Sequence, residues 1–373
     1  MKTAVQVARF LVGGLFIFSG LVKAIDPLGL GYKMQEFFEV WGGDGFLPGM
    51  MNSLHGQSLW FSISMIVLEV VLGVALLVGW RKNLVLTLLL LLTLFFTFLT
   101  AFVLFTGKIR ACGCFGDCIP LTPVQTFTKD IILTLLIIFL IVFKKYIQPL
   151  FKGLAGLLIV FAALIGTTFL QFYVLKHLPL KDCLPYKKGN DILELRKMPA
   201  GAVPDKYDYS FVYEKAGQQK EFTTDQLPDS TWKFVDRKQK LVSAGKNNVP
   251  AINDFSLVDS SGANITEEVL GQSGEYYLLF LQNMNEGVSR WSTTFSNLAQ
   301  QARKQNLPIY IVTSEKEKVN EFFNVRNTYN IPVLTCDATA IKTAARANPT
   351  LFVMKGPIVQ AKYSWADISK AIR

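Results

Sequence analysis

The chain has 373 residues, of which 51% are hydrophobic and only 18% are charged, a balance typical of membrane proteins. Its formal net charge is +10, but no patch combines basic residues with interleaved aromatic residues, so we expect no nucleic acid partner. Nearly all long apolar runs precede residue 176, and the remainder has the composition of a soluble protein. The sequence therefore predicts a membrane part followed by a soluble part.

Five segments are long enough to span a bilayer, which requires about 20 mostly apolar residues. The first is followed by Lys23-Ala24-Ile25-Asp26, which is no small-residue cleavage site, so we expect a retained helix rather than a signal peptide. The predicted spans are Thr3–Val22, Ser58–Gly79, Leu84–Thr106, Val124–Tyr146 and Gly153–Leu175.

The orientation of these spans is predicted from the basic residues of the short segments between them, because cytoplasmic loops are enriched in Lys and Arg. The basic residues concerned are Lys2, Arg9, Arg81, Lys82, Lys144, Lys145 and Lys152. They place the N-terminus in the cytoplasm and, after five crossings, residues 176–373 in the periplasm. We expect a multi-pass inner-membrane protein whose spans contact the lipid bilayer.

Three cysteines, Cys112, Cys114 and Cys118, form a CxCxxxC loop between the third and fourth spans, on the predicted periplasmic side. Disulfides form and exchange on that side, and exchange requires an accessible thiolate with a second thiol nearby. Lys108 and Arg110 favour the thiolate form, and a disulfide within Cys112-Gly113-Cys114 would be strained and easily reduced. The three cysteines are therefore the candidate catalytic residues of a thiol–disulfide oxidoreductase.

Cys183 lies shortly after the fifth span and is a candidate disulfide partner for the loop. In one arrangement Cys112 and Cys114 exchange while Cys118 and Cys183 form a static disulfide. In another, all four cysteines only pin the loop to the following segment. A metal site built from three thiolates and His177 or Cys183 lacks the paired CxxC spacing of structural zinc, so no metal is assigned.

Glu69 is an ionisable residue in the middle of the second span. Such a residue is costly in a bilayer and faces the bundle interior with a partner. Arg9 is the first candidate partner, and Lys23 is the weaker one because it lies near the external surface. A proton route, a polar anchor for a quinone and a structural ion pair all remain open.

The soluble part divides into a connector and a domain of alternating strands and helices. The connector, residues 176–248, has a predicted β-hairpin formed by Tyr209–Glu214 and Lys220–Thr223. Residues 249–373 form the domain, in which a mixed sheet is covered on both faces. Its predicted strands are Glu275–Gln282, Pro308–Thr313, Val333–Cys336, Leu351–Met354 and Val359–Tyr363, and its helices are Val288–Gln305, Glu315–Tyr329, Thr339–Arg346 and Trp365–Ile372.

Residues 249–373 resemble thioredoxin-fold domains of the peroxiredoxin/TlpA type in element order, in the lead-in Asp254–Asp259 and in Asn348-Pro349-Thr350-Leu351-Phe352. The resemblance implies that Pro349 is cis and borders the site. The turn after the first core strand, where the family carries its redox pair, has no cysteine here. A docking role follows, with Asn283, Met284, Asn285, Glu286, Gly287 and Pro349 as partner-binding residues. We expect Cys336 to be a buried apolar residue.

Residues 1–175 resemble the DoxX group in Arg9 with Gly13-Gly14, in Phe18–Lys23 and in Asp26-Pro27. The run Cys112–Gly116 is similar to MauE, the methylamine-utilisation member of that group. MauE-type proteins are implicated in maturing disulfide-rich periplasmic proteins. Their four-helix core is similar to vitamin K epoxide reductase, which passes electrons from thiols to a membrane quinone. The fifth span and the exported domain depart from MauE, so a role in methylamine metabolism does not follow.

The sequence thus predicts an all-α membrane bundle of five transmembrane helices, residues 1–175, followed by an α/β thioredoxin-like domain. The predicted function is thiol–disulfide redox chemistry that supports the maturation of exported proteins, with quinone as an electron acceptor and an exported client or redox protein as partner. In that mechanism Cys112 or Cys114 exchanges with the client and Cys118 resolves the mixed disulfide. The alternative is a non-catalytic membrane scaffold whose disulfides are structural and whose thioredoxin-like domain binds a partner protein.

Overall fold

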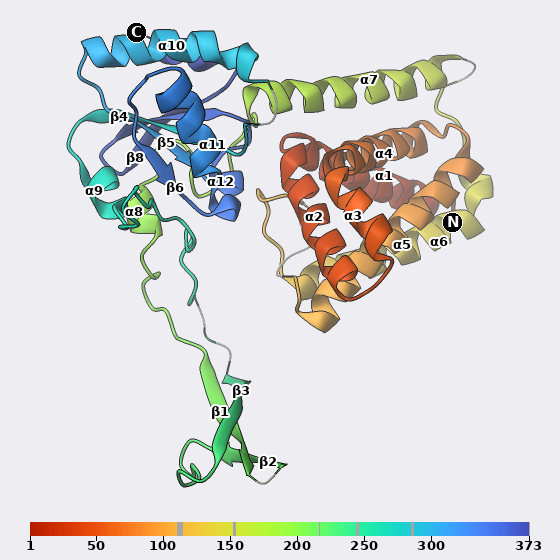
Figure 1. The fold of residues 1–373 in the computed structure, drawn as a ribbon. Coiled ribbons are helices and arrows are strands. Elements are labelled where there is room, and N and C mark those ends of the chain that lie inside the picture. Colours follow the sequence, from red (N-terminus) through yellow and green to blue (C-terminus); the bar gives the residue numbers. More distant parts are fainter. Residues whose placement is uncertain are drawn as a thin grey trace.

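A computed structural model describes residues 1–109, 115–151, 154–215, 217–243, 245, 247–284 and 287–372. Five of its helices are long and apolar enough to cross a membrane, and their buried side chains form one core. They are α1 (Lys2–Ala24), α4 (Ser58–Val78), α5 (Lys82–Thr106), α6 (Pro123–Val142) and α7 (Leu154–His177). In Figure 1 they run from left to right, and α7 lies along the upper edge of the bundle. The five predicted spans are confirmed.

Two helices, α2 (Pro27–Gly43) and α3 (Pro48–Gly56), lie between the first two spans, where the sequence analysis predicts no helix. The start of α2 has clear local causes. The Asp26 side chain accepts a hydrogen bond from the Gly29 amide as the N-cap, and Pro27 occupies the first helical position, where its missing N–H costs nothing. The apolar side of α2 packs on α4, with Phe37 and Phe38 buried.

Helices α1 and α4 pack closely at two glycines. A Cβ on Gly73 would lie 2.8 Å from the Gly13 carbonyl oxygen, and one on Gly13 would lie 2.6 Å from Leu77 Cδ2. Only glycine permits this approach, which fixes how far the two antiparallel helices are shifted past each other.

The C-terminal domain contains a five-stranded mixed sheet in the order β6-β5-β4-β7-β8. Its strands are β4 (Glu275–Leu281), β5 (Ile309–Thr313), β6 (Val333–Thr335), β7 (Thr350–Lys355) and β8 (Ile358–Ser364). Strands β4, β5 and β6 are parallel, whereas β7 is antiparallel to both β4 and β8. The predicted strands are confirmed to within two residues.

Side chains alternate along β4 between two cores, one on each face of the sheet. One face is covered by α9 (Thr266–Gly271) and α12 (Ala338–Ala344). The other is covered by α10 (Val288–Lys304), α11 (Lys316–Asn320), a π-helical turn (Glu321–Arg326) and a 3-10 turn (Ile368–Ala371). In place of the predicted helix Glu315–Tyr329, the chain forms the short α-helix α11 followed by the π-helical turn. In place of the predicted helix Trp365–Ile372, it forms only the short 3-10 turn.

The segment between α7 and the domain differs from the predicted connector in two ways. Tyr186 and Ile192, the latter at the start of α8 (Ile192–Leu195), are buried in the domain core, and the Gly189 amide donates to the Val359 carbonyl. The segment that contains Tyr186 and Ile192 is therefore part of the α/β domain, and the predicted start of that domain at residue 249 is wrong for this segment. The predicted hairpin is present but belongs to a three-stranded sheet, β1 (Lys206–Lys215), β2 (Gln218–Thr223) and β3 (Lys233–Ser243), which projects from the domain (Figure 1).

Candidate functional site

The cysteine loop is anchored at its carboxyl end. Cys118 forms a disulfide with Cys183, whose Cα lies 5.0 Å from that of Cys118 and 65 residues further along the chain. This is the arrangement in which these two cysteines form a static disulfide. With Cys118 joined to Cys183, the predicted role of Cys118 as the resolving thiol does not fit this structure. Cys112 and Cys114 lie outside the described residues.

Arg346, at the end of α12, connects the α/β domain to the membrane bundle. Its Nε donates to Asp26 Oδ2 at 2.8 Å, and its Nη2 donates to Asp117 Oδ2 at 3.0 Å. Asp117 precedes Cys118, so one guanidinium joins the domain both to the cysteine loop and to the start of α2. The side chain of Arg346 is only 6% exposed, and that of Asp26 is 20% exposed whereas that of Asp117 is 41% exposed. The pair with Asp26 is therefore the better shielded from water.

In the cluster of Arg346, Asp26 and Asp117, burial and the neighbouring charges shift the pKa values in opposite directions. Burial raises the pKa of the Asp26 carboxyl, and the adjacent Arg346 guanidinium only partly offsets that rise. For Arg346 itself burial acts to lower the pKa, but the carboxylates of Asp26 and Asp117 outweigh it and raise the pKa overall. The guanidinium therefore stays charged and holds both carboxylates.

Helix α2 and the segment before Cys183 add further contacts to this interface. The ring of Tyr32 lies 5.3 Å from the Arg346 guanidinium, and its hydroxyl donates to Gln282 Oε1 at 3.2 Å. Lys342 on α12 donates to Gln35 Oε1 at 3.5 Å. A second ion pair, Lys362 Nζ to Asp182 Oδ2 at 2.6 Å, fixes the residue before Cys183 to β8. Burial lowers the pKa of Lys362, and the Asp182 carboxylate opposes that change.

Of the residues predicted to bind a partner, Asn283 and Gly287 lie with Asn348 at the domain face next to the bundle. The Asn348–Pro349 peptide bond is cis, as the resemblance implied. Asn348 bridges the two segments, since its Oδ1 accepts from the Gln282 amide and its Nδ2 donates to the Asn283 carbonyl, both at 2.9 Å. Pro349 itself is buried, and Met284 packs against the core. Asn285 and Glu286 lie outside the described residues.

A cleft of about 630 Å³ opens between this face and the outer end of the bundle. The domain contributes Asn283, Asn348, Arg346, Trp291 and Trp365, and the bundle contributes mainly apolar or small residues. Arg290 lies 5.8 Å from the Trp365 ring. The bundle side of the cleft consists of Leu28, Gly56, Leu59 and Leu175.

The intramembrane carboxylate Glu69 pairs with Lys23 rather than with Arg9. Lys23 Nζ lies 2.5 Å from Glu69 Oε1, and Ser19 Oγ donates to Oε2 at 3.0 Å. Arg9 instead donates to the backbone carbonyls of Leu76 and Leu77 at 2.8 and 2.7 Å. The expected order of the two partners is therefore wrong, because the glycine contacts between α1 and α4 place Arg9 level with Leu76 and Leu77.

A second buried carboxylate, Asp130 on α6, was not singled out from the sequence. It accepts from Thr100 Oγ1 at 3.1 Å and pairs with Lys129 at 2.7 Å. Both ion pairs line a cavity of about 20 Å³ beneath Phe115, the residue that follows Cys114. This volume holds about one water molecule. A quinone ring does not fit it, so no quinone site is assigned to these residues.

Two other predicted residues have structural roles. His177 Nδ1 lies 2.8 Å from Asp367 Oδ2, which ties the end of α7 to the α/β domain. Cys336 is buried, as expected, and burial raises the pKa of its thiol to about 11. Among the residues that the structure describes, no group of three His, Cys, Asp or Glu side chains is placed to hold a metal ion.

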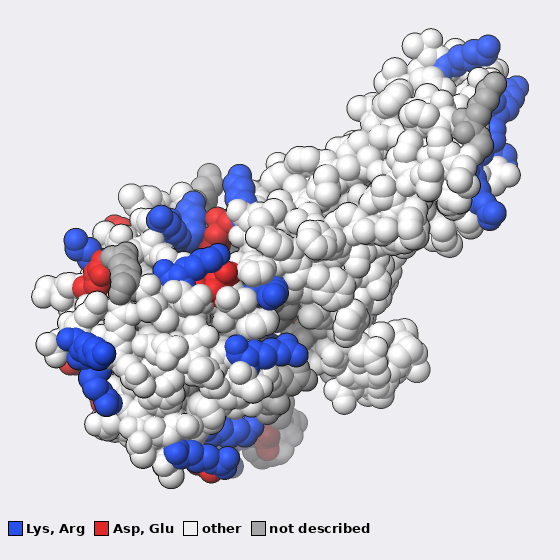
Figure 2. All heavy atoms as spheres, turned by 90° about the horizontal axis from the view of Figure 1, so that it is seen from above, with Lys and Arg blue, Asp and Glu red and all other residues white. Residues whose placement is uncertain are grey.

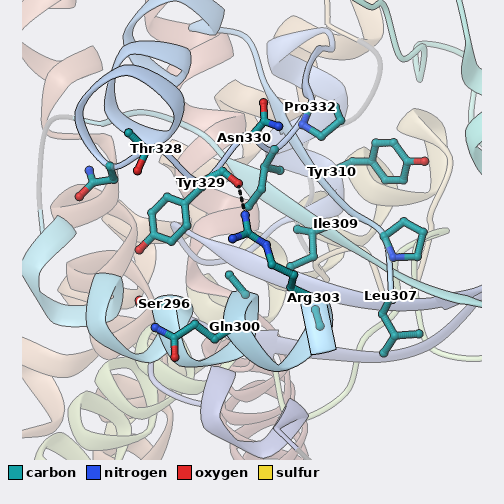
Figure 3. A pocket seen from close by; sticks show the side chains of 15 residues that line it. Ser296, Gln300, Arg303, Leu307, Ile309, Tyr310, Thr328, Tyr329, Asn330 and Pro332 are labelled. Atoms are coloured by element: carbon teal, nitrogen blue, oxygen red, sulfur yellow. Dashed lines mark hydrogen bonds between the residues drawn. The ribbon is translucent and has the colours of Figure 1, made fainter. Parts of the chain in front are cut away.

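A second hollow, of about 600 Å³, lies at the opposite end of α10 from the cleft (Figure 3). Arg303 Nη2 donates to the Tyr329 carbonyl across it at 3.0 Å. Its lining includes Gln300, Tyr310 and Asn330, and none of the predicted site residues belongs to it.

Comparison with known proteins adds four findings. Residues 1–143 match methylamine utilisation protein MauE, and residues 207–244 match a domain of unknown function (DUF8463). Protein TlpB of Flavobacterium psychrophilum is 36% identical over 135 residues, which are 35% of this chain and 35% of the relative. The chain thus spans about a third of the length of this curated relative. No solved structure matches the chain. The membrane part of this multi-pass protein is therefore MauE-like.

Proposed function

We propose that the protein is an inner-membrane thiol–disulfide exchange protein that supports the maturation of exported proteins. The disulfide between Cys118 and Cys183 is the observation that carries this proposal. It uses one cysteine of the CxCxxxC loop as an anchor and leaves Cys112 and Cys114 as the pair for exchange. The match of residues 1–143 to MauE and the likeness to TlpB support the same class of function.

The exchange proceeds in two steps that conserve electrons. A client thiolate attacks one sulfur of a Cys112–Cys114 disulfide, which breaks that bond and forms a mixed disulfide. The second client thiolate then attacks the mixed disulfide and releases the protein thiolate. The client dithiol is oxidised to a disulfide, and the two client protons pass to Cys112, Cys114 or water. Quinone as the final electron acceptor remains a prediction from the resemblance to MauE.

In this proposal the α/β domain is a docking module of the thioredoxin type. Its sheet order and cis Pro349 support that fold, and its described residues hold one free cysteine, the buried Cys336. The cleft beside Asn283 and Asn348 is where an extended client segment would bind. Arg346 lines that cleft and also contacts Asp117, so the client would be held next to the cysteine loop.

The orientation is part of the proposal. Figure 2 shows only Lys and Arg among the charged residues at the bundle end far from the α/β domain, and an uncharged band between the two. Arg81 and Lys144 belong to the loops at that end. The excess of positive charge supports a cytoplasmic location for it and a periplasmic location for the domain. Reporter fusions after residues 110 and 180 test this; a cytoplasmic signal from either overturns the assignment.

Alkylation trapping in native membranes tests the chemistry. Cys112→Ser and Cys114→Ser should each abolish exchange with client thiols, and one of them should accumulate a mixed disulfide. If neither variant loses exchange and no mixed disulfide is trapped, the exchange function is wrong.

The non-catalytic scaffold stays the alternative, because the anchoring disulfide and the missing CxxC pair of the domain also suit it. In that case the oxidation state of the loop would not follow the redox state of the membrane quinone pool.

A further inference from the structure

The three-stranded sheet β1–β3 has two faces of different chemistry. Residues paired across antiparallel strands share a face, and Phe211 pairs with Phe222 while Tyr213 pairs with Phe234. The ring of Tyr213 lies 5.8 Å from Phe222 and 5.7 Å from Phe234. We call this side the aromatic face; it consists of Tyr207, Tyr209, Phe211, Tyr213, Phe222, Phe234 and the adjoining Trp232.

The charges of the strands are divided between the two faces. Lys215, Lys220 and Arg237 lie over rings of the aromatic face, 5.9, 5.4 and 5.3 Å from the centroids of Trp232, Phe222 and Tyr209. The acidic residues of the strands occupy the opposite face, where Val212 pairs with Glu221 and Asp236 and where Lys238 binds Glu221 at 2.9 Å. These acidic residues are Asp208, Glu214, Glu221 and Asp236. The aromatic face is therefore positively charged and free of strand carboxylates.

The aromatic face is left uncovered. Phe234 is 52% exposed, and Tyr207 and Tyr209 are each 38% exposed, which is high for large apolar rings. In Figure 1 the sheet stands apart from both the bundle and the five-stranded sheet, and in the described part of the chain no helix packs on it. An exposed aromatic surface of this kind marks an interaction site.

The location of the sheet indicates what it binds. Figure 1 shows the α/β domain beyond the left end of the membrane helices and the sheet projecting sideways from it, past the outline of the bundle and close to the level of that end. The sheet thus projects to the side of the α/β domain, at about the level of the helix ends nearest the domain, which is where the proposed bilayer surface would lie. Tyr, Trp, Lys and Arg are the residues enriched at the boundary between bilayer and water.

We propose that the aromatic face binds the anionic phospholipid surface of the membrane beside the bundle. Lys215, Lys220 and Arg237 would contact lipid phosphates, and the rings would enter the headgroup region. A modest intrinsic affinity suffices, because the chain already tethers the sheet to the same membrane and the effective lipid concentration is high. The strands place no carboxylate on this face, so the acidic residues near it are the loop residues Asp205, bound by the Tyr207 hydroxyl, and Asp229, close to Lys215. The three cations therefore outnumber the carboxylates and favour an anionic surface.

The test uses the full-length protein reconstituted in liposomes of phosphatidylcholine, with or without 30% phosphatidylglycerol (about a third anionic lipid). The fluorescence of Trp232 is obtained as the difference between the wild type and Trp232→Phe, and lipids brominated near the headgroup serve as quenchers. We expect the Trp232 signal to fall by at least about half in anionic liposomes and less in neutral ones.

Two double variants with the same change in charge give the control. Lys215→Gln/Lys220→Gln alters the aromatic face and should remove most of the quenching, whereas Lys238→Gln/Lys240→Gln alters the opposite face and should leave it. Unquenched Trp232 in wild-type protein with anionic lipid overturns the proposal, and it is the result expected of a face that binds a protein instead. Equal effects of the two double variants also overturn it.

Discussion

Arg346 and Asp117 lie 229 residues apart in the chain and are joined by a hydrogen bond of 3.0 Å. The bond connects the last helix before the cis proline of the α/β domain to the residue next to Cys118. Because Arg346 also binds Asp26, the same side chain fixes the domain, the start of α2 and the cysteine loop relative to one another.

Replacing Arg346 should release the α/β domain from the bundle. Arg346→Ala leaves the largely buried Asp26 without its cation, which should weaken docking by about 3 kcal/mol, while the more exposed Asp117 adds little to this cost. Hydrogen exchange should then accelerate in α2 and α12 together. Arg346→Lys should keep only part of the docking between the domain and the bundle, since an ammonium lacks the planar fork that binds two carboxylates.

Arg326→Ala is the matched control for Arg346. Arg326 also pairs with a carboxylate, Glu321, but both side chains are more than half exposed. Its loss should change stability by less than about 1 kcal/mol and leave exchange in α2 unaltered. Similar effects of the two alanine variants would contradict a specific role for Arg346.

Cys118→Ser and Cys183→Ser should have the same effect, because each removes the same disulfide. The bond closes a loop of 65 residues, for which chain entropy gives a stabilisation of about 4 kcal/mol. Both variants should be less resistant to denaturant yet keep thiol exchange with clients. A loss of exchange in Cys118→Ser alone would restore Cys118 as the resolving thiol.

Glu69→Gln should destabilise the bundle more than removal of both charges does. The glutamine leaves Lys23 charged and buried without its carboxylate, at a cost of about 3 kcal/mol or more. Lys23→Met/Glu69→Leu removes the uncompensated charge and should recover much of that loss. Unfolding in mixed detergent micelles measures the difference; a double variant as unstable as Glu69→Gln contradicts the pairing.

The thiol of Cys336 should make stability depend on pH in the alkaline range. Burial raises its pKa from 9.0 to about 11 in the folded protein, so the folded state holds the proton more tightly than the unfolded state. The contribution of this thiol to the free energy of unfolding is therefore fully present below pH 9. It is lost as the pH rises from 9 through 11, by about 1.4 kcal/mol per pH unit. Cys336→Val should lack this dependence, and native Cys336 should resist alkylation at pH 8.

The spans and the strands of the α/β domain could be predicted because each depends on local pattern, apolar length or alternation. The cis proline was expected only from the resemblance to thioredoxin-fold domains. Helix α2 was missed although Asp26-Pro27 is a helix start signal, because its apolar residues are too few to resemble a span. The partner of Glu69 could not be deduced, since it depends on how α1 and α4 are shifted at Gly13 and Gly73. Nothing in the sequence singled out Arg346, because the two carboxylates that it binds, those of Asp26 and Asp117, belong to distant segments of the chain.

The disulfide between Cys118 and Cys183 also bears on how the chain is made. Helices α6 and α7 lie between the two cysteines. In the proposed orientation, with residues 176–373 periplasmic, the bond can form only after both helices have entered the bilayer and the following segment has been translocated. Its formation during biosynthesis therefore marks the completion of membrane insertion. A pulse-labelled chain would gain this bond only after α7 has left the ribosome. Formation of the disulfide therefore reports a late stage of membrane assembly, in addition to anchoring the cysteine loop.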